Sequence, residues 1–100
     1  MQVDNGRLLH EVLARLSRLE EGGGLLLQPF KKDRAIFVIL RDGMYQVLER
    51  GFARKDFVVD SKKIKKLLKR LCRKEFPRSN KVWLTRHPLE AIKILTEKYS

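Results

Sequence analysis

Cysteine, acidic residues and long apolar runs are all scarce in this sequence of 100 residues. Cys72 is the only cysteine, which excludes an internal disulfide and a cysteine-rich zinc site, and a reducing cytoplasm is therefore the expected location. No stretch approaches eighteen consecutive apolar residues, so the sequence predicts no membrane-spanning helix. The first sixteen residues have no apolar segment followed by a small-residue cleavage site, and we expect no secretory signal there.

Basic residues outnumber acidic ones, 23 against 12, which gives a formal net charge of +11. The excess is concentrated in one part of the chain. Residues 61–86 hold eleven basic residues and one acidic residue, Glu75, whereas the first thirty residues hold three basic and four acidic ones. A hydrophobic content of 43% is sufficient for a core, and we expect a single domain over residues 1–100. Such a concentration of one sign of charge suggests a polyanionic partner.

Hydrophobic periodicity predicts three helices and four or five strands. The helices are expected at residues 6–20, 61–76 and 87–99, and the strands at 25–30, 34–40, 44–49, 56–60 and 81–85. Pro29 favours an edge position for the first strand, whereas the apolar run at 35–40 is typical of a central strand covered on both faces. Asp42 and Gly43 indicate a tight hairpin turn. The expected fold class is α+β, with an antiparallel sheet packed by helices in the order α-β-β-β-(β)-α-β-α.

The helix at 61–76 has one apolar face and one basic face. Its apolar positions are Ile64, Leu67, Leu68, Leu71 and Cys72. We expect this face to be buried, together with Leu13, Phe37 and Val38 from other parts of the chain. At 100° per residue, the outward face carries a column of four cations, Lys62, Lys66, Lys69 and Arg73, flanked by Lys63, Lys65, Arg70 and Lys74. Cations spaced about 5 to 6 Å apart along a helix can follow a phosphate backbone. Further groups able to bond to phosphates or base edges follow the helix, namely Arg78, Ser79, Asn80, Lys81 and Arg86.

Three interpretations of this basic run remain open. Like charges three and four apart repel on a helix, and only Glu75 is acidic between Ser61 and Arg86, which favours a nucleic-acid partner. An acidic protein or a membrane surface is the second interpretation, and the membrane is the weaker of the two because the apolar face of the helix is needed for the core. The third is an ordinary solvated face of a basic protein.

The order helix, three strands, helix, with "SKKIKK" opening the second helix, is similar to the double-stranded-RNA-binding domain. The run "VVDSKKIKKLLKRL" also resembles the small Alu-binding proteins of the signal recognition particle. Both resemblances cover at most residues 6–76 and leave "KVWLTRHPLEAIKILTEKY" outside, and Leu and Ile stand where the RNA-binding domain has alanines in its second helix. The resemblance implies RNA rather than DNA as the partner.

Other reactive side chains do not form a recognisable catalytic or metal-binding set. His10 is expected on the surface, and His87 has no second acid–base group nearby in the sequence. Cys72 is more typical of inert core than of a nucleophile. Asp60 or Ser61 is expected to cap the second helix, and Asp56 lies four residues before Asp60, a common spacing.

Two aromatic residues are candidates for base stacking. Trp83 and Tyr45 could stack on bases if they are exposed, but "VWL" favours a core position for Trp83.

The sequence therefore predicts a nucleic-acid-binding protein that is not an enzyme and uses neither cofactor nor metal. RNA is the preferred partner, in a ribonucleoprotein or in translation. The predicted interface consists of Lys62, Lys63, Lys66, Lys69, Arg70, Arg73, Lys74, Arg78, Asn80, Lys81 and Arg86. A protein–protein adaptor that docks its basic helix on an acidic partner is the alternative, and a small nuclease is the third. The oligomeric state is left open.

Overall fold

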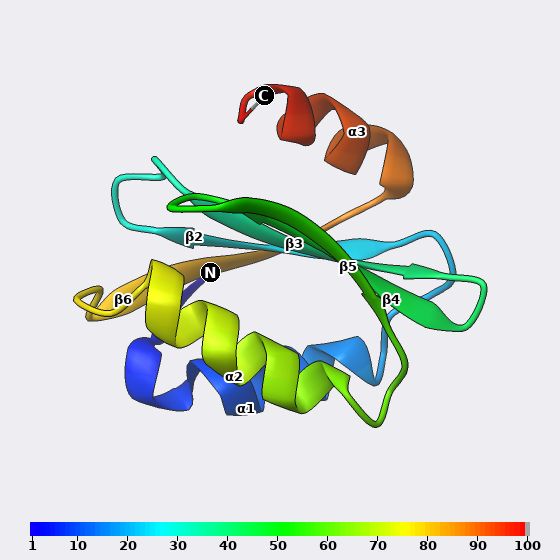
Figure 1. Ribbon diagram of the computed structural model, residues 1–100, viewed down its shortest axis with the longest axis horizontal. Helices are drawn as coiled ribbons and strands as arrows, with labels where there is room; N and C mark the ends of the chain where they lie inside the picture. Colours follow the sequence, from blue (N-terminus) through cyan, green and yellow to red (C-terminus); the bar gives the residue numbers. More distant parts are fainter. Residues whose placement is uncertain (100) are drawn as a thin grey trace.

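A six-stranded antiparallel sheet lies between two layers of helices in the computed structural model, which describes residues 1–99 (Figure 1). The strands are β1 (Gln2–Asp4), β2 (Gly24–Pro29), β3 (Ala35–Arg41), β4 (Met44–Arg50), β5 (Arg54–Val59) and β6 (Lys81–His87). The helices are η1 (Asn5–Arg7), a 3-10 turn, followed by α1 (Leu8–Leu16), α2 (Ile64–Glu75) and α3 (Leu89–Glu97). Across the sheet the order is β1-β6-β2-β3-β4-β5. The predicted α+β class is confirmed, with β1 as an unpredicted first strand.

The two faces of the sheet carry separate apolar clusters, because successive side chains of a strand point to opposite faces. α1 and α2 cover one face, where Leu25, Leu27, Ile36 and Val38 belong to the larger cluster. α3 covers part of the other face, where Ile92 packs with a smaller cluster, Leu26, Ala35, Phe37, Ile39 and Leu48. β3 contributes buried residues to both clusters, which confirms it as a central strand.

The predicted edge position of the first long strand is wrong, because β6 pairs with β2 on the side away from β3. Proline is tolerated there because Pro29 is the last residue of β2. The β3 ladder ends at the pair Leu27–Ile36, so at Pro29 only the β6 side of the strand is paired. The hairpin prediction is confirmed: Asp42 and Gly43 have φ values of 53° and 74°, the left-handed values of a type I′ turn.

Asp60, one of the two predicted caps, holds the turn that leads into α2. Its Oδ1 accepts hydrogen bonds from the backbone N–H groups of Lys62 (3.0 Å) and Lys63 (3.1 Å). Pro77 follows shortly after the helix ends at Glu75, and Phe76 between them is fully buried. The predicted apolar positions of α2 are buried, as are Phe37 and Val38, and Glu75 is buried in addition, which was not predicted.

The first helix is shorter than predicted and is rotated slightly about its axis. Leu8 is only 1% exposed, whereas Leu13, expected in the core, is half-buried. Asn5 explains part of this difference, because its Nδ2 donates hydrogen bonds to the carbonyl oxygens of Phe76 and Ser79, both at 2.8 Å. These bonds hold η1 against the segment after α2, and the α-helix begins only beyond it.

Candidate nucleic-acid interface

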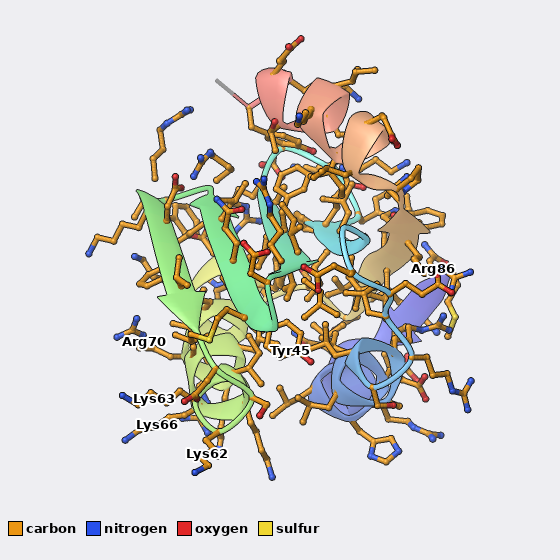
Figure 2. All side chains as sticks on the ribbon, turned by 90° about the vertical axis from the view of Figure 1, so that its right-hand side faces the viewer. Tyr45, Lys62, Lys63, Lys66, Arg70 and Arg86 are labelled. Carbon is orange, nitrogen blue, oxygen red and sulfur yellow. The ribbon has the colours of Figure 1, made fainter. Side chains whose placement is uncertain are left out.

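The outward side of α2 forms one wall of a groove of about 1020 Å³ that extends to β5. We call it the basic groove. Its lining contains seven cations and no acid, namely Lys62, Lys63, Lys66, Lys69, Arg70, Arg73 and Lys74, together with Phe57, Val59 and Leu67. Figure 2 shows Lys62, Lys63, Lys66 and Arg70 extending from this side of the molecule. The structure therefore brings together the seven residues predicted on this helix.

Most of these cations have no acidic partner. Lys74 is the exception, since its Nζ lies 3.1 Å from Oε2 of the buried Glu49. Over residues 1–99, the other six form no ion pair within 4.0 Å, although the Arg70 guanidinium lies over the Phe57 ring at 5.6 Å. α2 also has no acid in its first turn, where the helix dipole favours negative charge. The cations on this face are therefore largely uncompensated within the described part of the chain.

The floor of the basic groove is apolar and lies next to a free sheet edge. Phe57 and Val59 are half-buried and pack against the core from β5. β5 is the last strand in the sheet, so within residues 1–99 one of its edges is unpaired. Lys74 and Arg70 are thus held by Glu49 and Phe57, whereas Lys62, Lys63 and Lys66 are exposed and free to follow a ligand.

The predicted residues beyond α2 fall into three different settings. Arg78 and Asn80 are exposed on the loop before β6 and line a second groove. Lys81 is paired with Asp4 across β1 and β6 (2.9 Å), so its charge is compensated. Arg86 lies on the opposite side of the molecule in Figure 2, where it lines a hollow with Arg15 and Arg18 of the first helical region. The structure does not bring Arg86 together with the basic groove.

Glu75 is not on the basic face at all. Its side chain and that of Glu49 are both 0% exposed. Burial raises the pKa of Glu75, and its hydrogen bond with Glu49 raises it further. The pKa of Glu49 is lowered instead. Burial acts to raise it, but the hydrogen bonds with Glu75 and Lys74 and the positive charge of Lys74 outweigh the effect of burial. The pKa values of the two buried carboxyl groups are thus shifted in opposite directions, and Glu75 is the one that holds its proton more tightly.

Several other predicted roles can be placed. Cys72 is buried, and burial raises the pKa of its thiol to about 12, which leaves it unreactive. Tyr45 is half-buried and packs against the larger cluster. Trp83 is half-buried rather than fully buried, and the Lys32 ammonium lies 4.9 Å from its ring centroid. Nε2 of His87 lies 2.8 Å from the Thr85 hydroxyl.

Two exposed aromatic residues were not singled out from the sequence. Phe30 follows Pro29 at the end of β2, and Phe52 follows Gly51 at the end of β4. Phe52 lies in the turn after Gly51, a break visible in the sequence that could have indicated exposure, whereas Phe30 was expected to end the strand at 25–30 and lies in the turn after Pro29. They line the same groove as Arg78 and Asn80.

Within residues 1–99, no three His, Cys, Asp or Glu side chains are grouped as metal ligands. None of the helices in that same range is long and apolar enough to cross a membrane. No protein-family model, no characterised protein and no solved structure matches this chain.

Proposed function

We propose that the protein binds nucleic acid, with RNA preferred, by placing phosphates along the basic groove. The observation that supports this proposal is the set of six cations in one groove without an acidic partner in residues 1–99. A helix of 12 residues is about 18 Å long, and a duplex carries one charge for every 1.7 Å or so of its axis. About ten phosphates, or about five on each strand, lie along that length of duplex, so the strand nearest α2 offers about the number needed for four to six contacts.

A salt titration tests the proposal. With four to six phosphate contacts, the slope of log K against log salt is expected to be about −3 to −5 for a duplex, since each neutralised phosphate releases a counterion. Lys66→Ala is expected to make the slope shallower by about one and to weaken binding to all sequences alike. The measurement is fluorescence anisotropy with duplex RNA and duplex DNA of the same sequence.

Lys93→Ala is the matched control, because Lys93 is an exposed cation of α3, on the other side of the sheet. It is expected to leave the slope unchanged. No binding of either duplex by tens of micromolar protein at about 150 mM salt would contradict the proposal, because even non-specific duplex binding lies near that range.

An acidic protein partner is the second candidate, and the free edge of β5 favours it. An extended acidic peptide could pair with that edge while its side chains meet the cations of α2. Binding to such a partner would also weaken as the salt concentration rises. Binding to an acidic peptide together with no binding to either duplex would select this candidate.

A further inference from the structure

A second groove, of about 840 Å³, lies beyond the C-terminal end of α2. We call it the loop groove. Three loops form it: those joining β2 to β3, β4 to β5 and α2 to β6. Figure 1 shows these loops gathered at one end of the molecule, on the left of the view. The basic groove follows α2 and ends near this site, because Pro77, only two residues beyond the helix, already lines the loop groove.

The loop groove exposes two phenylalanine rings. Phe30 is 71% exposed and Phe52 is 69% exposed, and both belong to its lining. Single exposed apolar residues are common on protein surfaces. Two large aromatic rings in one hollow are different, because each forgoes the burial that usually stabilises such a side chain.

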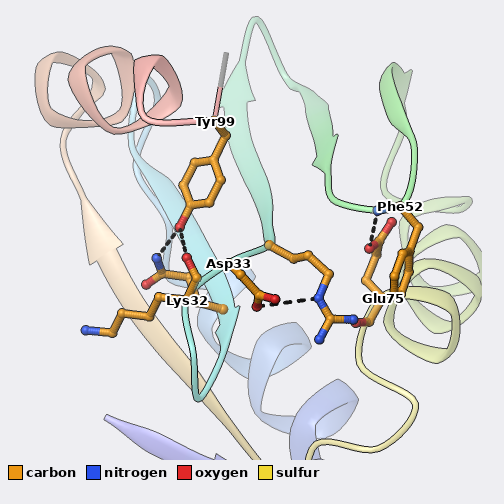
Figure 3. Close-up of polar contacts among 7 residues, drawn as sticks. Lys32, Asp33, Phe52, Glu75 and Tyr99 are labelled. Atoms are coloured by element: carbon orange, nitrogen blue, oxygen red, sulfur yellow. Dashed lines mark hydrogen bonds and ion pairs between the residues drawn. The ribbon is translucent and has the colours of Figure 1, made fainter.

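Phe52 is held in place by a network around buried Glu75 (Figure 3). Its backbone N–H donates a hydrogen bond to Oε1 of Glu75 at 2.9 Å. The Arg34 guanidinium stacks over the Phe52 ring at 4.7 Å and donates a hydrogen bond to the carbonyl oxygen of Glu75. Arg34, Phe52 and Glu75 come from three different segments, so the network ties the walls of the loop groove together. A ring on such a support can accept a ligand with little loss of conformational entropy.

The close approach at this network depends on Gly51. A Cβ atom at position 51 would lie 2.0 Å from Oε1 of Glu75, so only glycine fits beside that carboxyl group. Gly51 therefore lets the backbone lie against the Glu75 carboxyl group directly before Phe52.

The charge around the rings is positive. Four cations and one acid, Asp33, belong to the lining. Arg34 and Lys81 are paired with Asp33 and Asp4, whereas Lys31 and Arg78 form no ion pair over residues 1–99. Exposed aromatic rings beside unpaired cations are the combination that binds single-stranded nucleic acid, since bases stack on the rings while phosphates meet the cations.

We propose that the loop groove holds unpaired nucleotides, with bases stacked on Phe30 and Phe52 and phosphates at Lys31 and Arg78. This inference rests on the proposed function, because it makes the loop groove the continuation of a strand whose phosphates follow α2. The preferred ligand is then a duplex with a single-stranded extension rather than a blunt duplex. The volume of the loop groove, about 840 Å³, is within the range of about 300 to 1,000 Å³ that is typical of sites for small ligands. Such a volume accommodates only a few nucleotides.

The test compares a blunt RNA duplex with the same duplex carrying an overhang of about five nucleotides. Wild-type protein is expected to bind the overhang duplex more tightly, by about 5-fold to 150-fold if one base is stacked. The double variant Phe30→Ala and Phe52→Ala is expected to lose this preference and to bind the blunt duplex as wild type does. Both side chains are exposed, so the variant is expected to fold, which circular dichroism verifies.

Two further variants complete the design. Phe30→Tyr with Phe52→Tyr keeps two aromatic rings and is expected to retain the preference. Ile94→Ala removes an equally exposed apolar side chain, 69% exposed, from α3 and is expected to change nothing. Equal binding of blunt and overhang duplexes by wild type, or an unchanged preference in the double alanine variant, would overturn the inference while leaving the proposed function standing. Absence of binding to either duplex would overturn both.

Discussion

The side chain of Glu75 shows how far a single residue can depart from the role that its neighbours in sequence suggest. It is the only acid among eleven cations in residues 61–86, and in sequence it reads as a partial counter-charge to them. In the fold it points inward, accepts a hydrogen bond from the Phe52 N–H, and has its pKa raised by burial and by the neighbouring Glu49. Its position follows the apolar spacing of α2, since Glu75 lies four residues after Leu71 and three after Cys72. Periodicity could have predicted its burial, but not the second carboxyl group that β4 brings to it.

The buried carboxyl pair makes stability depend on pH. Because the pKa of Glu75 is raised in the folded state, its stabilising contribution is fully present below the unfolded pKa of about 4.3 and is lost as pH rises through the folded value. The variant Glu75→Gln replaces the carboxyl group by an amide, which does not titrate. Its free energy of unfolding is therefore not expected to fall as the pH rises through the folded pKa of Glu75. The expected difference is about 1.4 kcal/mol for each unit by which the pKa is raised. Urea denaturation between pH 4 and pH 8 measures it.

Two other variants separate this effect from general charge removal. Glu49→Gln abolishes the ion pair with Lys74 and is expected to destabilise the protein above pH 4.3 or so, because the lowered pKa of Glu49 contributes stability there. Glu90→Gln neutralises an exposed acid of α3 and is expected to leave the pH profile unchanged. If wild type and Glu75→Gln show the same pH profile, the inference that folding raises the pKa of Glu75 is wrong.

At the scale of the element, α2 was the easiest part of the structure to predict and the most informative. Its apolar positions, the turn at Asp60 that leads into it and its end before Pro77 all follow from the sequence. The groove beside it does not, because Phe57 and Val59 come from β5, a strand whose position at the sheet edge depends on the pairing of all the others. A helical projection gives the direction of each cation but not the surface that faces it.

The packing of α2 can be tested at Leu68, which is fully buried. Leu68→Ala is expected to lower the free energy of unfolding by about 2 to 5 kcal/mol, through lost transfer energy and the cavity that remains. Chemical denaturation measures the loss. A loss below about half a kcal/mol is typical of surface positions and would show that the orientation of the helix, and with it the basic face, is wrong.

The outward cations of α2 are expected to reduce its stability rather than support it. Replacing Lys66 and Lys69 by Glu should leave the protein folded and raise the free energy of unfolding by a few tenths of a kcal/mol, because repulsion along the helix is relieved. The same variant should lose affinity for duplex RNA. Lys93→Glu on α3 is the control for charge reversal, and it should affect neither property strongly. Unfolding of the double variant would mean that these lysines are structural.

At the scale of the whole molecule, local patterns predicted the elements but not the sheet order. Every predicted helix and strand is present. Four strands, β2 to β5, lie between α1 and α2, whereas the double-stranded-RNA-binding domain has three strands there. The short β1 carries too few residues for periodicity to reveal it. The position of β6 between β1 and β2 is a long-range pairing, and no local signal encodes such a partner. The loop groove was missed for the same reason, since its three loops meet only in the folded chain.

The central place of β6 has a consequence for the chain as it is synthesised. Until residues 81–87 have left the ribosome, β1 has no neighbour, and the side of β2 that carries the β6 ladder, including Leu25, Leu26 and Leu27, stays bare. A nascent chain that has completed only β2 to β5 therefore has two unpaired edges, the apolar strand β2 at one end of the sheet and β5 at the other. We therefore expect the sheet to close only after residues 81–87 have emerged, and the exposed edge of β2 to be open to chaperone binding until β6 inserts.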